Sequence, residues 1–153
     1  MNKQNRVGYT TIHALYKQVL GQMIEDNYTP DRIIGLGRGG LDMAVKFSHH
    51  FKVPMDCLMM QTRDGNTVMP KYQDLAFKET NILIVDDICD SGKTMRLVKP
   101  AYADVFSGNL KVAVAYTDVP HTLDGLVDYY GSVIDRTTNH LWYVFPWENT
   151  SWR

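Results

Sequence analysis

Apolar residues repeat at helical spacing in two segments of the first half of the chain, residues 10–23 and residues 41–51. Each pattern predicts a helix with one apolar face against a core. Between them, residues 32–36 form a short run of branched apolar residues that predicts a strand entering a glycine-rich turn. Residues 53–60 predict a further strand after the second helix.

The second half of the chain repeats this order of strand and helix. Residues 81–85 predict a strand, a helix begins at Thr94, and residues 111–116 predict the next strand. Strands that alternate with helices predict a mainly parallel sheet covered on both faces, which is the α/β class. Residues 141–145 predict a last strand, and the polar residues 61–78 predict a long loop of the kind that is usually functional or disordered.

Residues able to carry chemistry gather in the segment NILIVDDICDSGKT, residues 81–94. Asp86 and Asp87 follow the predicted strand directly, so they stand at the carboxyl end of the sheet, where α/β proteins bind ligands. Paired carboxylates there suit the hydroxyls of a sugar cis-diol or a hydrated Mg²⁺. Residues 90–94 then turn into a helix, and such a turn gathers backbone N–H groups and hydroxyls that suit a phosphate.

Two simpler interpretations of this segment explain less. Gly92, Lys93 and Thr94 spell the end of a Walker A loop, but that motif requires glycine where the chain has Asp87. ATP hydrolysis is therefore disfavoured. An acidic helix cap would explain one aspartate but not three carboxylates together with a glycine and two hydroxyls.

The stretch VDDICDSGKT resembles the phosphoribosyl pyrophosphate (PRPP) signature of type I phosphoribosyltransferases. This resemblance implies that Asp86 and Asp87 hold the ribose hydroxyls and Mg²⁺. It also implies that Asp90 lies near the purine N7 as a general acid or base. The residues that would hold the 5′-phosphate are Asp90, Ser91, Gly92, Lys93 and Thr94.

The glycine cluster at residues 35–40 allows more than one interpretation. It satisfies the pattern GxGxxG, and Asp56 lies at a suitable distance for a ribose contact, so a dinucleotide-binding oxidoreductase is a competing prediction. That prediction leaves the aspartate motif without a role, and the chain is short for a cofactor domain plus a catalytic domain. By resemblance, the cluster is the pyrophosphate-binding loop, with Arg38 as a bidentate cation, and its residues are Gly37, Arg38, Gly39 and Gly40. Taken alone, it also fits a tight turn.

The tail LWYVFPWE is similar to the segment of bacterial xanthine-guanine phosphoribosyltransferases whose aromatic residue stacks on the purine. The similarity places Trp142 at the stacking position, with Tyr143 beside it in a small C-terminal base-binding hood. A core aromatic residue is the alternative for Trp142.

Two positions depart from the family pattern. The lysine expected to contact the purine 6-oxo group is replaced by Thr117 and Asp118, and a carboxylate cannot donate to an oxo oxygen. Either another group contacts the base or a base with an exocyclic amine is preferred, and Asp118 also fits a turn cap. Near the start of the long loop, the serine-tyrosine pair of the family is replaced by Thr62 and Arg63. Arg63 and Lys71 are candidates for a charged lid, although such residues usually serve solvation.

Composition adds few constraints. The chain has 153 residues, which predicts one domain over residues 1–153. A net charge of -1 argues against a nucleic-acid partner. Cys57 and Cys89 form no metal or disulfide pattern, and no apolar run is long enough to predict a membrane span, so a cytoplasmic protein is expected.

The combined prediction is a nucleotide-salvage enzyme with the type I phosphoribosyltransferase fold. It would join a purine base, of 6-oxopurine type, to PRPP with Mg²⁺ as cofactor and release pyrophosphate. A homodimer or homotetramer is expected. The alternative is a regulator that binds PRPP without catalysis.

Overall fold

The computed structural model describes residues 3–63, 66–68, 81–105 and 109–149. Its main sheet has five strands in the order β3-β2-β6-β7-β8, and every neighbouring pair is parallel. The predicted parallel α/β sheet is therefore confirmed. The strands are β2 (Arg32–Gly37), β3 (Met55–Met59), β6 (Asn81–Cys89), β7 (Asn109–Asp118) and β8 (Tyr129–Ile134).

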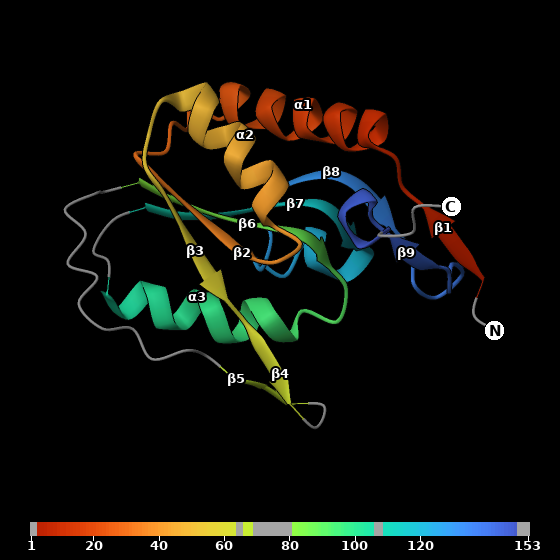
Figure 1. Ribbon diagram of the computed structural model, residues 1–153. Helices are drawn as coiled ribbons and strands as arrows, with labels where there is room; N and C mark the ends of the chain where they lie inside the picture. The colour runs from red at the N-terminus through yellow and green to blue at the C-terminus, as the bar shows by residue number, and fades with distance from the viewer. Residues whose placement is uncertain (1–2, 64–65, 69–80, 106–108, 150–153) are drawn as a thin grey trace.

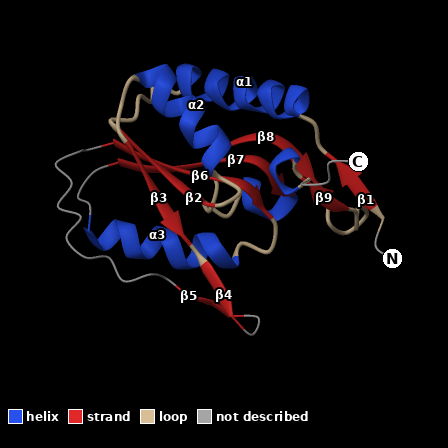
Figure 2. Cartoon of the chain, in the orientation of Figure 1, coloured by secondary structure: helices blue, strands red, loops and turns tan. Residues whose placement is uncertain are grey.

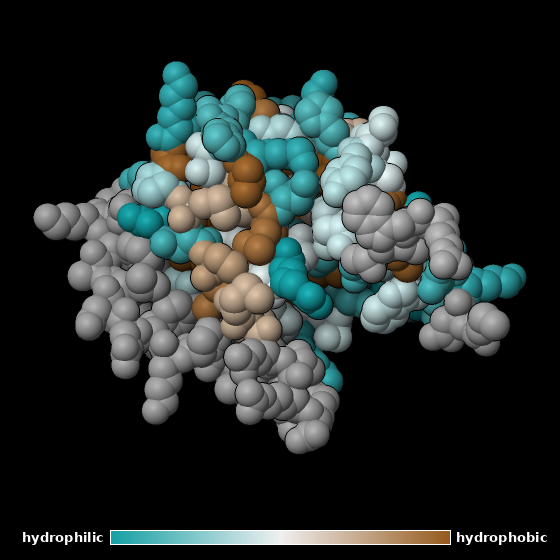
Figure 3. Space-filling view, viewed as in Figure 1, coloured by the Kyte–Doolittle hydropathy of each residue, from teal (hydrophilic) through white to brown (hydrophobic). Residues whose placement is uncertain are grey.

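Helices cover both faces of this sheet (Figures 1 and 2). Helices α1 (Tyr9–Glu25) and α2 (Leu41–Phe51) lie on one face, and α3 (Lys93–Val105) lies on the other. In each helix the buried apolar residues recur every three or four positions, with adjacent pairs at Leu15–Tyr16 and Met43–Ala44, which is the pattern of a single helical face. The outward side of α1 is mostly polar, whereas apolar residues show along α2 (Figure 3).

The central strands bury both of their faces. In β6, Leu83 and Val85 pack in the core beneath α1 and α2, while Ile82 and Ile84 pack in the core beside α3. Successive side chains of a strand point to opposite faces, so a strand between two helix layers needs a continuous apolar run. This requirement explains the run of residues 82–85 that leads into Asp86.

A second, two-stranded sheet lies beyond the carboxyl ends of β6 and β7 (Figure 1). It pairs β1 (Gln4–Arg6) with β9 (Trp142–Val144) in parallel, with Gln4 opposite Trp142. Short 3-10 helices precede and follow this region at η1 (Val119–Thr122) and η2 (Pro146–Glu148). The predicted last strand is confirmed, but its partner β1 was not predicted.

Three sequence-based predictions need correction. Residues 61–78 are not entirely loop, because β4 (Gln61–Arg63) pairs in antiparallel fashion with β5 (Asn66–Val68), while residues 64–65 and 69–78 lie outside the described residues. Strand β6 continues to Cys89, so Asp86 and Asp87 lie inside the strand and do not follow it. Strand β8 was not predicted.

No helix within the described residues has the length and apolar character of a membrane span.

The packing of α1 on the sheet generates a stability prediction at Gly131. A Cβ atom there would lie 2.7 Å from the Leu15 Cβ and 2.8 Å from the Ala115 carbonyl oxygen. We expect Gly131→Ala to lower the free energy of unfolding by about 1–3 kcal/mol, because the helix or the strand must shift. Chemical denaturation measures this change.

Gly21→Ala is the matched control, because Gly21 lies within α1 and has no heavy atom within 4 Å of an added Cβ. Replacing a helical glycine should raise the free energy of unfolding by roughly 0.5–1 kcal/mol. Equal effects of the two substitutions would contradict the packing described for α1.

Candidate active site

Two pockets flank the acidic pair in β6. Asp87 lines the larger pocket, of about 740 Å³, together with Arg38, Gly39 and Trp147. Asp86 lines a smaller pocket, of about 110 Å³, together with residues 88–95. Strand alternation sends neighbouring side chains to opposite faces, so the pair delivers one carboxylate to each pocket.

The glycine loop after β2 lies against β6. An added Cβ at Gly39 would be 2.0 Å from the Asp87 Oδ2, and one at Gly40 would be 2.1 Å from the Val85 carbonyl oxygen. Both positions therefore require glycine, which lets the backbone reach the acidic pair. Arg38 is exposed at the larger pocket, and the peptide bond between Gly37 and Arg38 is cis.

The carboxylates of the pair are held by the backbone of their own strand. The N–H of Asp87 donates to the Asp86 Oδ1 at 2.9 Å, and the N–H of Ile88 donates to the Asp87 Oδ1 at 2.7 Å. Burial, followed by the charge of Asp87, holds the pKa of Asp86 well above its ordinary value. Burial also raises the pKa of Asp87, against the opposing effect of its hydrogen bonds.

The pair is suited to a cation that brings ligands of its own. Two carboxylates with disfavoured charge supply hard oxygen ligands, and a divalent cation between them would favour their ionised form. Within the described residues, no group of three His, Cys, Asp or Glu side chains could complete a metal site. A cation held by this pair would take its other ligands from water or from a substrate.

Residues 90–94 form a phosphate-type loop at the smaller pocket. Gly92 has a φ of 81°, a left-handed conformation that favours glycine, and α3 begins at Lys93. His121 Nε2 lies 2.8 Å from the Asp90 carbonyl oxygen, and Arg96 donates to the Ser91 carbonyl oxygen at 2.8 Å. The N–H of Lys93 makes only a long hydrogen bond to the Ser91 Oγ, at 3.4 Å, and backbone N–H groups at the start of a helix are the donors that such a loop can offer to an anion.

His121 supports this loop from behind and was not predicted. It is 4% exposed, and its Nδ1 lies 2.6 Å from the Asp124 Oδ2. Both ring nitrogens of His121 thus lie within hydrogen-bond distance of an oxygen, one on each side of the ring. The sequence gives no local signal for His121, because its contact with Asp90 joins segments far apart in the chain.

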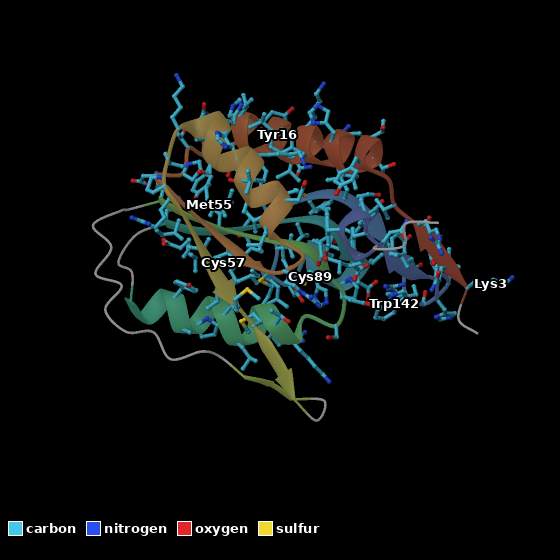
Figure 4. All side chains as sticks on the ribbon, viewed as in Figure 1. Lys3, Tyr16, Met55, Cys57, Cys89 and Trp142 are labelled. Atoms are coloured by element: carbon cyan, nitrogen blue, oxygen red, sulfur yellow. The ribbon has the colours of Figure 1, made fainter. Side chains whose placement is uncertain are left out.

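The residues predicted to contact the base lie on β7 and β9. Trp142 is 58% exposed on β9, and in the view of Figure 4 it lies between Cys89 and Lys3. Tyr143 packs on Tyr116 with ring centroids 4.9 Å apart. Asp118 caps η1, as the alternative interpretation expected, because its Oδ1 accepts the N–H of Val119 at 2.8 Å.

Arg136 is a site residue that the sequence did not reveal. Its guanidinium donates to Asp90 at two points, Nε to Oδ1 at 3.0 Å and Nη2 to Oδ2 at 2.9 Å. It also donates to the Leu141 carbonyl oxygen at 2.6 Å and lies over the ring of Tyr143 at 5.4 Å. A single arginine after an unpredicted strand forms no motif. Trp147 and Glu148 also line the larger pocket, and the FPWE stretch was the signal for them.

The remaining candidates lie away from the site or outside the description. Asp56 pairs with Arg32 at 2.6 Å and lies opposite Ile34 inside the sheet, so it is not at the carboxyl ends where a ribose contact would be needed. This position disfavours the dinucleotide-binding interpretation. The Arg63 side chain and Lys71, the candidate lid residues, lie outside the described part of the chain.

The acidic pair generates a prediction on stability. Because the folded state raises the pKa of Asp86, the stability associated with its protonated form is present at low pH and is lost as the pH rises through the folded pKa. Asp86→Asn keeps the Oδ1 acceptor and removes the charge. We expect it to raise the melting temperature at pH 7 by a few degrees, and the gain to vanish below about pH 3.9, the ordinary Asp pKa.

Thermal unfolding at both pH values measures this effect. The melting temperature of the wild-type protein at each pH value is the reference. A gain for Asp86→Asn that is equal at both pH values would contradict the electrostatic explanation.

Known proteins resemble this chain over most of its length. The family model described as the phosphoribosyl transferase domain matches residues 8–149. A xanthine-guanine phosphoribosyltransferase of Cereibacter sphaeroides is 28% identical over 130 residues, which are 80% of this chain and 72% of that protein. A second enzyme with this name, from Roseobacter denitrificans, is 31% identical over 88 residues, which are 58% of this chain and 44% of that protein.

Solved structures agree with these relatives. A purine phosphoribosyltransferase from Pyrococcus horikoshii has a TM-score of 0.75 and 27% identity, covering 99% of this chain and 97% of its own. A Helicobacter pylori xanthine-guanine-hypoxanthine phosphoribosyltransferase shares the fold, with a TM-score of 0.79 at 17% identity, covering 95% and 94% of the two chains.

The predictions of a type I phosphoribosyltransferase fold, and of a PRPP-dependent purine phosphoribosyltransferase similar to the xanthine-guanine enzymes, are thereby confirmed at the level of family and fold. Neither the dinucleotide-binding interpretation nor a non-catalytic regulator is favoured. With a family match over residues 8–149 and both phosphate-type loops beside one acidic pair, this chain belongs to the phosphoribosyltransferase family.

Proposed function

We propose that this chain transfers ribose 5-phosphate from PRPP to a 6-oxopurine-like base, with release of pyrophosphate and formation of a nucleoside monophosphate. One observation carries the proposal: Asp86 and Asp87 deliver one carboxylate to each of two pockets, one beside a glycine loop with Arg38 and one beside a phosphate-type loop. PRPP has a ribose with a phosphate on one side and a pyrophosphate on the other. The two pockets match that order.

The smaller pocket suits the 5′-phosphate. Its volume of about 110 Å³ is too small for a nucleotide, and residues 90–94 line it. The loop amides and the hydroxyls of Ser91 and Thr94 would donate to the phosphate. Lys93 adds a positive charge at the mouth, where it is exposed.

The larger pocket suits the pyrophosphate. Gly37, Arg38, Gly39 and Gly40 form the loop whose backbone approaches Asp87 most closely, and Arg38 would bind the departing anion. Asp86 and Asp87 would hold the ribose hydroxyls. They would also hold Mg²⁺, which takes one or two carboxylates together with substrate phosphate oxygens and neutralises charge on the pyrophosphate.

In the proposed reaction, the bond between the anomeric carbon and pyrophosphate breaks as the base nitrogen N9 forms its bond to that carbon. The proton on N7 of the base passes to Asp90, whose side chain is 49% exposed at the edge of the loop. Arg38 and the loop amides hold the charge that builds on the pyrophosphate. Trp142 and Tyr143 are assigned to the base side, with Trp142 stacking on the purine.

The proposal treats residues 1–153 as one catalytic domain of a cytoplasmic protein that forms a homodimer or homotetramer. A near-neutral charge supports the absence of a nucleic-acid partner. Exposed apolar side chains on α2 and β3, among them Val45 and Met59, leave surface that a second subunit would cover.

Incubation with PRPP, Mg²⁺ and a panel of purines tests the function, with pyrophosphate release and product mass as measurements. We expect nucleoside monophosphate from hypoxanthine, guanine or xanthine, and loss of turnover when Mg²⁺ is chelated. PRPP binding without pyrophosphate release for any base would instead favour a regulator.

Asp90→Asn tests the acid-base assignment. Since the amide cannot accept the N7 proton, we expect kcat to fall by roughly 10²- to 10⁴-fold. The Kd for PRPP should change little, because the loop amides remain. Glu25→Gln, far from the site, should leave both quantities unchanged. Unchanged turnover in Asp90→Asn would remove Asp90 from the proton-transfer role.

A further inference from the structure

We propose that Arg136 is the cation that reads the 6-oxo group of the purine, and that it makes the enzyme select 6-oxopurines over 6-aminopurines. The inference rests on the proposed function, which places Asp90 beside the purine N7. It gives Arg136 the role of the lysine that the family pattern expects and that Thr117 and Asp118 replace in this chain.

The Asp118 carboxylate already accepts hydrogen bonds from two backbone N–H groups. Its Oδ1 accepts the N–H of Val119 at 2.8 Å and the N–H of Arg136 at 3.1 Å. A carboxylate has no proton to give an oxo oxygen, so Asp118 cannot replace the lysine chemically. It fixes the backbone of Arg136 instead, and the cation at the base end thus comes from the end of β8.

The Arg136 side chain is fixed on three sides. Asp90 binds two of its N–H groups, the Leu141 carbonyl binds Nη1, and the ring of Tyr143 lies 5.4 Å from the guanidinium carbon. The side chain is 19% exposed. A donor that is fixed and largely shielded from water discriminates more strongly than a solvated one.

One hydrogen of Arg136 remains for a ligand. A guanidinium has five N–H groups, of which Asp90 takes two and the carbonyls of Leu141 and Asn139 take two, at 2.6 Å and 3.4 Å. The contacts among described residues leave the second hydrogen on Nη2 unused. That hydrogen lies next to the Asp90 Oδ2, which keeps a lone pair because a carboxylate oxygen accepts two hydrogen bonds.

Arg136 and Asp90 therefore present a donor and an acceptor side by side. A 6-oxopurine with its proton on N7 presents the complementary pair, an acceptor at O6 and a donor at N7. A 6-aminopurine presents donors at the 6-amino group, which would face the N–H of Arg136. The ion pair of Arg136 and Asp90 thus favours binding of 6-oxopurines and disfavours binding of 6-aminopurines.

The test measures kcat/KM for hypoxanthine and for adenine in Arg136→Met, which keeps the alkyl stem and removes the donors. We expect kcat/KM for hypoxanthine to fall by about 10- to 100-fold, with little change for adenine, so that the preference is lost. Arg136→Lys, which restores a cation, should give an intermediate loss for hypoxanthine. The Kd for PRPP, measured without base, should stay near the wild-type value.

Arg6→Gln is the matched control, because Arg6 is an exposed arginine on the strand that pairs with β9. It should leave the preference intact. An equal loss for both bases in Arg136→Met, or a parallel rise in the Kd for PRPP, would show that Arg136 only holds the structure and would overturn the inference. If Arg136→Met does not fold, the ratio of kcat/KM for hypoxanthine to kcat/KM for adenine in Arg136→Lys decides between the same two outcomes.

A second measurement separates this inference from the proposed function. If the wild-type protein releases no pyrophosphate with any base, the proposed function fails, and calorimetric binding of the free bases hypoxanthine and adenine, whose N7 can carry a proton, tests Arg136 directly. Tighter binding of hypoxanthine that Arg136→Met abolishes would support the assignment. Equal binding of the two bases, or binding of neither, would overturn it.

Discussion

The contact between the glycine loop after β2 and strand β6 sets the geometry of the active site. An added Cβ would lie 2.0 Å from the Asp87 Oδ2 at Gly39 and 2.1 Å from the Val85 carbonyl oxygen at Gly40, so the loop backbone packs directly against β6. The larger pocket depends on this approach, because Arg38 and Gly39 line it together with Asp87, and the smaller pocket begins at Asp86 on the same strand. A side chain at either glycine would separate the two layers that form the site.

The same arrangement explains why the acidic pair is unfavourable for the fold. Strand β6 is buried on both faces up to Val85, and Asp86 and Asp87 continue it as charged residues. Burial raises the pKa of both carboxyl groups, and the charge of Asp87 raises the pKa of Asp86 further. Native proteins retain such groups mainly where a ligand or cation compensates for them.

Features that depend on neighbouring residues could be predicted from the sequence, and features that depend on distant contacts could not. The helical spacing of Ile12, Leu15 and Val19 and the motif at residues 81–94 are local, so the layers were predicted, and so was the turn from β6 into α3. The end of β6 was misplaced because aspartates are poor strand formers, and sheet pairing with β7 overrode that preference. Arg136 and His121 act on Asp90 from segments far along the chain, and no local pattern records such contacts.

The pairing of β1 with β9 has a consequence for how the protein is made. Strand β1 precedes every strand of the main sheet in the sequence and β9 follows every one of them, so synthesis delivers β1 before, and β9 after, all five strands. The main sheet needs neither partner for its own hydrogen bonds, so it can form before β1 and β9 pair. The strand that carries Trp142 pairs over a longer stretch of chain than any other described strand, so the segment with Trp142 can be the last to take its place.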